Sequence, residues 1–247
     1  MKKFLYFTLL ITACNSKDQK LDGAYILVAA KYEDSTLSKN NSENNKTIRV
    51  FKNGYWINIC FTQKSIINCY GGTYKIKDEH CTQTVDFNST DTSVIGKEYS
   101  CEYDLDNKYS SISFTGVDLN KKGYEKEVYE KISNAEPLKN TSLEGVWIMR
   151  TGQAGYSDNN EIIRIFSFPA FTRTIYNFKE KRFKNTYGGT YQFDGKELIE
   201  KIEYSNYQIP PGSTMEWSVK KLTDNEIQLF DVDSFNDEEI FIQTNNQ

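Results

Sequence analysis

Two arginines occupy matching places in the sequence and are the side chains best suited to hold a charged ligand. Residues 48–51 read Ile-Arg-Val-Phe, and residues 163–166 read Ile-Arg-Ile-Phe. In a strand, Arg49 and Arg164 each share a face with the Phe two positions later. On an interior face the guanidinium could pair with a ligand carboxylate or sulfate. On an outer face it would be a solvated residue beside a cross-strand acid, and a stack on an aromatic ring is the third interpretation.

The pentapeptide Tyr-Gly-Gly-Thr-Tyr occurs at 70–74 and again at 187–191. A glycine-rich string suggests a phosphate loop, but here it sits inside strand-like segments and not before a helix. Glycines within a strand permit the bulge that coils a sheet into a barrel, and the flanking tyrosines can cover the bare backbone. We interpret the stretch as architecture first. The candidate ligand-binding residues are Arg49, Trp56, Tyr70, Tyr74, Trp147, Arg164, Tyr187 and Tyr191.

Four cysteines, Cys60, Cys69, Cys81 and Cys101, all fall in the first half of the chain. In an exported protein an even set suggests two disulfides, with three possible connectivities. We favour Cys60 with Cys69, which flank one hairpin, and Cys81 with Cys101 on neighbouring strands. Zinc is the competing interpretation because His80 precedes Cys81, but the Cys-x-x-Cys unit of structural zinc sites is missing. We therefore predict no metal and no cofactor.

An enzymatic function has little support in the residue types. His80 is the one histidine, so a Ser-His-Asp arrangement has few ways to form. The formal net charge of −4 comes from interspersed acidic and basic residues, which argues against a basic field that would attract nucleic acid. We predict a protein that is not an enzyme and does not bind nucleic acid.

The N-terminus has the pattern of a secretory signal. Met1-Lys2-Lys3 precedes an apolar run over 4–13, which is too short to span a bilayer. The run ends in Ile11-Thr12-Ala13-Cys14, which resembles the bacterial lipobox. The resemblance implies cleavage before Cys14 and diacylation of its sulfur, and each acyl methylene contributes about 0.8 kcal/mol to membrane binding. The alternative is an ordinary signal-peptidase site at Ala13 with an incidental Cys14.

The lipobox resemblance also carries an expectation about location. The residue after the lipid-bearing cysteine is Asn15 and not Asp, the inner-membrane retention signal, so outer-membrane delivery is favoured. Residues 14–20 are polar and are predicted to be a tether. We expect an outer-membrane lipoprotein facing the periplasm or the cell surface, with the membrane itself as its first partner.

The sequence contains one unit twice. A Leu-acid-Gly-x-aromatic start, the Arg strand, Tyr-Gly-Gly-Thr-Tyr and a closing Glu-x-aromatic strand occur in the same order in both halves. Insertions between these landmarks fall where loops tolerate them. The predicted divisions are a signal peptide at 1–13, a tether at 14–20, a first barrel at 21–132, a linker at 133–142 and a second barrel at 143–244.

Period-two alternation predicts strands within each unit. Tyr55, Ile57, Ile59 and Phe61 alternate with Trp56, Asn58 and Cys60, which is typical of a strand with one buried face. The predicted strands of the first copy lie near 23–31, 47–52, 55–61, 66–76, 80–87, 97–105, 110–117 and 124–132. Those of the second lie near 145–150, 161–167, 171–179, 185–193, 196–204, 213–220, 226–231 and 237–243. Short hairpin connections predict an all-β fold of two eight-stranded antiparallel meander barrels.

Gly145-Val146-Trp147 and, with Tyr for Trp, Gly23-Ala24-Tyr25 match the Gly-x-Trp of the first lipocalin strand. Together with the long first loop and the meander, they make the chain resemble the tandem lipocalin-like domains of uncharacterised function in Bacteroidetes lipoproteins. The resemblance implies calycin-like cups with the first loop near the mouth and a small apolar or amphipathic ligand.

Two functions follow as hypotheses. The first is a lipid-anchored envelope protein that binds a small hydrophobic ligand in one or both barrels. The second is a structural or interaction lipoprotein with filled barrels that recognises another envelope protein or a glycan, since an eight-stranded barrel is just wide enough for its own side chains.

Overall fold

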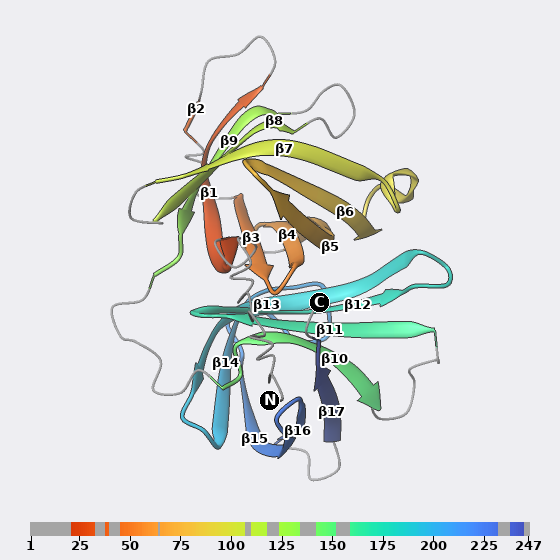
Figure 1. Cartoon of the computed structure of the whole chain (residues 1–247). Coiled ribbons are helices and arrows are strands. Elements are labelled where there is room, and N and C mark those ends of the chain that lie inside the picture. The colour runs from red at the N-terminus through yellow and green to blue at the C-terminus, as the bar shows by residue number, and fades with distance from the viewer. Residues whose placement is uncertain are drawn as a thin grey trace, which may run out of the picture.

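The computed structural model describes residues 21–32, 38–39, 45–63, 65–106, 110–117, 124–133, 142–151, 159–231 and 238–244. The predicted signal peptide, the tether with Cys14 and most of the predicted linker lie outside these residues. Within them, no helix is long and apolar enough to cross a membrane. The described chain forms two stacked β-structures, which we call barrel 1 and barrel 2 (Figure 1).

Barrel 1 is a meander that closes because its first strand pairs with both its second long strand and its last. A short strand inside the predicted first loop also pairs with β1, which the polar sequence of that loop did not predict. The strands are β1 (Gly23–Tyr32), β2 (Ser38–Lys39), β3 (Lys46–Lys52), β4 (Tyr55–Phe61), β5 (Ile66–Lys77), β6 (His80–Asn88), β7 (Glu98–Leu105), β8 (Ser111–Val117) and β9 (Tyr124–Lys131), with the 3-10 turn η2 (Thr92–Val94) between β6 and β7.

Barrel 2 repeats this topology with eight strands and closes through the pairing of its first and last strands. Its strands are β10 (Gly145–Thr151), β11 (Asn160–Ser167), β12 (Ala170–Asn177), β13 (Arg182–Phe193), β14 (Glu197–Ser205), β15 (Thr214–Thr223), β16 (Glu226–Asp231) and β17 (Glu238–Gln243). The predicted fold class, two tandem eight-stranded antiparallel meander barrels, is confirmed, and the predicted strand ends agree within a few residues.

The two Tyr-Gly-Gly-Thr-Tyr stretches lie in β5 and β13 and each contains a bulge. The register against β6 shifts between Gly71 and Gly72, and the register against β14 shifts at the matching glycines. A Cβ on Gly72 would overlap the carbonyl oxygen of Thr84, and one on Gly189 would overlap that of Lys201. The neighbouring backbone approaches so closely that only glycine fits, which explains the motif by architecture.

The last tyrosine of each motif closes one end of its barrel. Tyr74 donates its hydroxyl hydrogen to Asp22 Oδ1 at 3.2 Å, and Tyr191 donates to Glu144 Oε1 at 2.9 Å. Both acids directly precede the Gly-x-aromatic start of a first strand. Lys52 lies between them, with its Nζ 3.6 Å from Asp22 and 2.7 Å from Glu144. The closed ends of the two barrels are thereby joined.

The barrels bury their outer faces against each other, which corrects the prediction of one buried face for residues 55–61. Trp56 and Asn58 point into barrel 1, while Ile57, Ile59 and Phe61 belong to an apolar cluster shared with barrel 2. In Figure 1, β11, β12 and β13 lie directly beneath β3 and β4. Both faces of β4 are therefore buried, one in a barrel and one between barrels.

Ring contacts show that the two barrels meet through equivalent surfaces. Phe61 packs on Tyr204 with ring centroids 4.7 Å apart, and Tyr176 packs on Phe87 at 5.4 Å. Phe61 and Tyr176 hold the same place in the two copies, as do Phe87 and Tyr204. The duplicated units thus pack like the subunits of a two-fold symmetric dimer.

Candidate functional site

A cavity of about 340 Å³ opens at the end of barrel 1 where the β4–β5 hairpin and the β6–β7 connection meet. This volume lies at the low end of the range for ligand pockets, which begins at about 300 Å³. Its polar lining consists of Thr47, Asn58, Asn68, Asn88, Thr90, Asp91 and Glu127. The remaining lining residues are Leu27, Cys60, Tyr70, Val85 and Val94. The resemblance implied an apolar or amphipathic ligand, whereas most of these side chains are polar.

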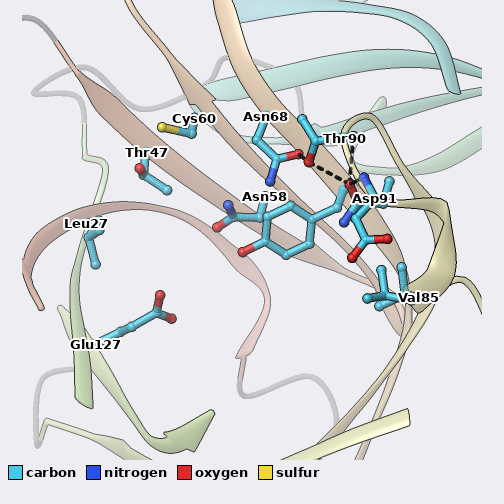
Figure 2. Close-up of a pocket in the computed structure, with 12 residues that line it drawn as sticks. Leu27, Thr47, Asn58, Cys60, Asn68, Val85, Thr90, Asp91 and Glu127 are labelled. Atoms are coloured by element: carbon cyan, nitrogen blue, oxygen red, sulfur yellow. Dashed lines mark hydrogen bonds between the residues drawn. The ribbon is translucent and has the colours of Figure 1, made fainter. Parts of the chain in front are cut away.

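Strand register brings the floor of the cavity together. Asn58 on β4 lies opposite Arg49 on β3 and Tyr70 on β5, and all three side chains point inward. Glu127 comes from β9, on the other side of the closed sheet. Figure 2 shows the Glu127 carboxylate directed to the same space as the Asn58 amide. Residues far apart in the sequence thus form one polar floor.

Arg49 supports this floor from beneath. Its Nε donates to Asn58 Oδ1 at 3.0 Å, and its Nη1 lies 3.0 Å from Glu127 Oε2. The guanidinium carbon also lies 4.6 Å from the centre of the Tyr129 ring. Burial lowers the pKa of Arg49, but Glu127 and, with smaller effects, Tyr129 and Tyr70 together hold that pKa above its ordinary value. The guanidinium therefore stays charged inside the barrel, beside the Glu127 carboxyl group.

The rim of the cavity is the connection from β6 to β7. Asn88 Oδ1 accepts hydrogen bonds from the backbone N–H groups of Thr90 and Asp91, each at 2.9 Å. Asp91 caps η2 by accepting from the Ser93 N–H at 2.9 Å, and hydrogen bonding to the Ser93 side chain, and next to this N–H, lowers the pKa of the Asp91 carboxyl. Val94 points inward from the same turn and is buried. The rim is consequently a hydrogen-bonded structure with a charged carboxylate on it.

The predicted ligand-binding residues of the first copy have different roles. Tyr70 lines the cavity, and burial raises its pKa to about 12, so its phenol stays protonated. Trp56 packs edge-on against Tyr70 at 5.5 Å and donates from Nε1 to the Thr73 carbonyl at 3.1 Å. Tyr74 lies at the closed end. Arg49 has the interior place that ligand binding required, but its charge is paired within the protein.

The predicted residues of the second copy are buried in the interior of barrel 2. Arg164 is fully buried, and its Nη2 donates to the Tyr187 hydroxyl at 3.0 Å and lies 3.6 Å from Glu200 Oε2. Arg173 pairs with Glu239 at 2.6 Å. Trp147 donates to the Leu143 carbonyl at 2.8 Å, and Tyr191 is bound to Glu144. These side chains serve the core of barrel 2.

The four cysteines of barrel 1 are free thiols, so the predicted disulfides are absent. Cys60 cannot bond to Cys69 because they lie on opposite faces of the sheet, one lining the cavity and the other in the cluster between barrels. Cys81 and Cys101 do lie opposite each other on β6 and β7, and Cys101 Sγ donates to the Cys81 carbonyl at 3.5 Å. His80 begins β6 on the exposed surface. Among the placed residues, no three His, Cys, Asp or Glu side chains gather as a metal site.

Sequence reasoning missed the residues that distinguish this cavity. Asn58 and Asn68 were part of predicted strands and Asn88 directly followed one, all without an assigned role, and Glu127 was only a landmark of the repeat. The sequence did contain one signal, because the place of Asn58 in the first copy is held by Arg173 in the second. This difference points to the barrel interior only when it is known that these side chains face inward.

No family model and no curated protein matches the chain. A solved structure to which it is similar is a lipocalin-like protein from Bacteroides uniformis, with 18% identity and a TM-score of 0.32. The match covers 42% of this chain and 99% of that one. The fold described above rests on the strand pairing of the chain itself.

Proposed function

We propose that this protein is a lipid-anchored binding protein of the cell envelope, whose first barrel holds a small ligand at its mouth. The observation that carries the proposal is the cavity of about 340 Å³ with an inward-facing polar lining. Asn58 and Glu127 are almost entirely buried beneath it and keep their hydrogen-bonding groups near a space large enough for a ligand. Buried polar groups that converge on a cavity are typical of ligand sites.

The second barrel supports the first in this proposal. Its interior is occupied by its own arginine, glutamate and aromatic side chains, and its outer face covers β3 to β6 of barrel 1. A large apolar contact of this kind holds two domains in a fixed arrangement. Barrel 2 then acts as a rigid support. For this half of the chain, the proposal keeps the structural role that belonged to the second hypothesis.

Ligand binding is tested by thermal shift with fatty acids, sterols, haem and sugars as probes. A probe that binds only the folded state stabilises it by about 2.7 kcal/mol at a hundred times its Kd. The control is the double variant Asn58→Arg with Gln83→Glu, which gives barrel 1 the interior residues of barrel 2. We expect at least one probe to raise the Tm of the natural protein and not that of the variant. No shift with any probe contradicts the proposal.

The anchor is tested separately by labelling cells with radioactive palmitate. The proposal expects incorporation into the natural protein and release of the Cys14→Ser variant from the membrane fraction. Equal labelling of both proteins would place the lipid on another residue. No labelling of either protein would contradict the anchor.

A further inference from the structure

The hydrogen bonds around the cavity use the oxygen atoms of its asparagines and leave their NH₂ groups for a ligand. Asn58 Oδ1 accepts from Arg49 Nε, and Asn88 Oδ1 accepts from the backbone N–H groups of Thr90 and Asp91. Arg Nε and backbone N–H groups can only donate. The orientation of both amides is therefore set by the protein, with the NH₂ end free to donate.

The third asparagine follows the same pattern. Asn68 Oδ1 accepts from the hydroxyls of Ser89 at 3.0 Å and Thr90 at 3.2 Å, as Figure 2 shows for Thr90. The Ser89 hydroxyl also accepts from the Cys69 N–H at 2.9 Å. Across the described ranges, none of the three asparagine amide nitrogens has a hydrogen-bond partner. Strands β4, β5 and the end of β6 thus present a row of donors.

Acceptors stand at the other sides of the same cavity. Glu127 uses Oε2 for both Arg49 and the Tyr129 hydroxyl, which leaves Oε1 for a ligand. Asp91 accepts from the Ser93 N–H with Oδ1, and its carboxylate lies at the rim of the cavity. Among the described residues that line the cavity there is no lysine or arginine, and Arg49 beneath them is already paired with Glu127. These residues therefore offer no free positive charge to an anion.

We infer, on the basis of the proposed function, that the ligand is a small neutral polyhydroxylated molecule of the carbohydrate class. Each sugar hydroxyl both donates and accepts, so it can pair with an asparagine NH₂ and with a carboxylate oxygen. The ring of Tyr70 offers an apolar surface between them. An apolar ligand would leave these amides unpaired, and a fatty acid would bring its carboxylate toward Asp91 without a cation to meet it.

The thiol of Cys60 allows occupancy of this site to be measured whatever the ligand. Cys60 lines the cavity and is half-buried, whereas the other three cysteines of barrel 1 are buried. The rate of its alkylation by N-ethylmaleimide is followed by peptide mass spectrometry with the full chain. The probes are glucose, N-acetylglucosamine and lactose as neutral sugars, palmitate as an apolar anion and spermidine as a cation.

We expect a neutral sugar to slow alkylation of Cys60. Asn68→Asp and Asn88→Asp keep the oxygen that accepts the internal hydrogen bonds but lose the NH₂ donor. Each variant is expected to weaken sugar binding about tenfold, the effect of losing one hydrogen bond of about 1.4 kcal/mol. The matched control is Asn185→Asp, at the place of Asn68 in barrel 2, which leaves sugar binding unchanged. An unchanged Tm shows that a variant is folded.

The outcomes separate this inference from the proposed function. Protection of Cys60 by palmitate or spermidine, and by none of the sugars, overturns the inference and leaves a ligand-binding barrel standing. Sugar protection that is undiminished in both folded asparagine variants also overturns it, because the sugar is then not held by the amides. No protection by any of the three classes counts against both.

Discussion

The two barrels have the same strand order and the same bulged central strand, but their interiors differ at the mouth. Strand register identifies the equivalent places, since Asn58 lies between Arg49 and Tyr70 just as Arg173 lies between Arg164 and Tyr187. The inward pairs that differ include Thr47 and Ile162, Asn58 and Arg173, Cys60 and Ile175, and Gln83 and Glu200. At these places barrel 1 has smaller or neutral side chains, and three of them, Thr47, Asn58 and Cys60, line the cavity.

The difference shows that the barrel interiors gain buried charges as a cation together with an anion. Among its described residues, barrel 1 has one interior ion pair, Arg49 with Glu127. Barrel 2 keeps its counterpart, Arg164 with Glu239, and adds Arg173 and Glu200 together. An unpaired buried charge is strongly destabilising, so a cation and an anion must be gained together. In barrel 2 the added side chains occupy the interior, and in barrel 1 two amides leave room.

The largest expected effect tests what the barrels share. Gly72→Val and Gly189→Val each place a side chain against the backbone of the next strand, where overpacking costs about 3 kcal/mol or more. We expect both variants to lose cooperative unfolding or most of their stability by circular dichroism. If Gly72→Val folds normally and loses only ligand binding, the motif belongs to the site and not to the architecture.

The second prediction tests the difference between the barrels by giving barrel 1 two interior residues of barrel 2. Asn58→Arg alone adds a second buried cation where Glu127 already balances Arg49, and it is expected to reduce the free energy of unfolding by about 3 kcal/mol. Adding Gln83→Glu should recover a large part of that loss, because barrel 2 balances the same two places, with Arg173 paired to Glu239 and Glu200 near Arg164. Chemical denaturation of both variants measures the recovery. Additive losses would show that the two places are not coupled as they are in barrel 2.

The third prediction concerns the contact between the barrels. Burial, and next the charge of Glu161, raise the pKa of Asp86 to about 6. Because this value is above the ordinary 3.8, folding takes up a proton between roughly pH 4 and 6, and stability falls as the pH rises through that range. Asp86→Asn should then raise stability at pH 7 by about 1 kcal/mol, after allowing for solvent screening of the partly exposed carboxyl. At pH 4 the variant and the natural protein should have the same free energy of unfolding. An equal increase in stability at pH 4 and at pH 7 would contradict the prediction.

The smallest effect concerns the ion pair at the closed ends. Lys52 lies 2.7 Å from Glu144 across the two barrels, and both side chains are partly solvated. Lys52→Ala is expected to reduce the free energy of unfolding by about 0.5 kcal/mol, less so in 1 M salt. Urea unfolding at two salt concentrations measures it. A loss of several kcal/mol would mean that the barrels depend on this pair and not on their apolar contact.

The sequence by itself determined the duplication, the strands and the closing bulges. Alternation and turn residues are local signals, and all sixteen long strands follow them, while the Gly-Gly pairs mark places where a neighbouring backbone leaves no room for a Cβ. Only the tertiary structure decided which face of a strand is inward. Apolar residues on both faces of β4 made Ile57 and Ile59 look like barrel core, and they lie between barrels. The cavity was beyond local signals for the same reason, since Asn58, Asn88 and Glu127 come from separate strands and meet only when the sheet closes.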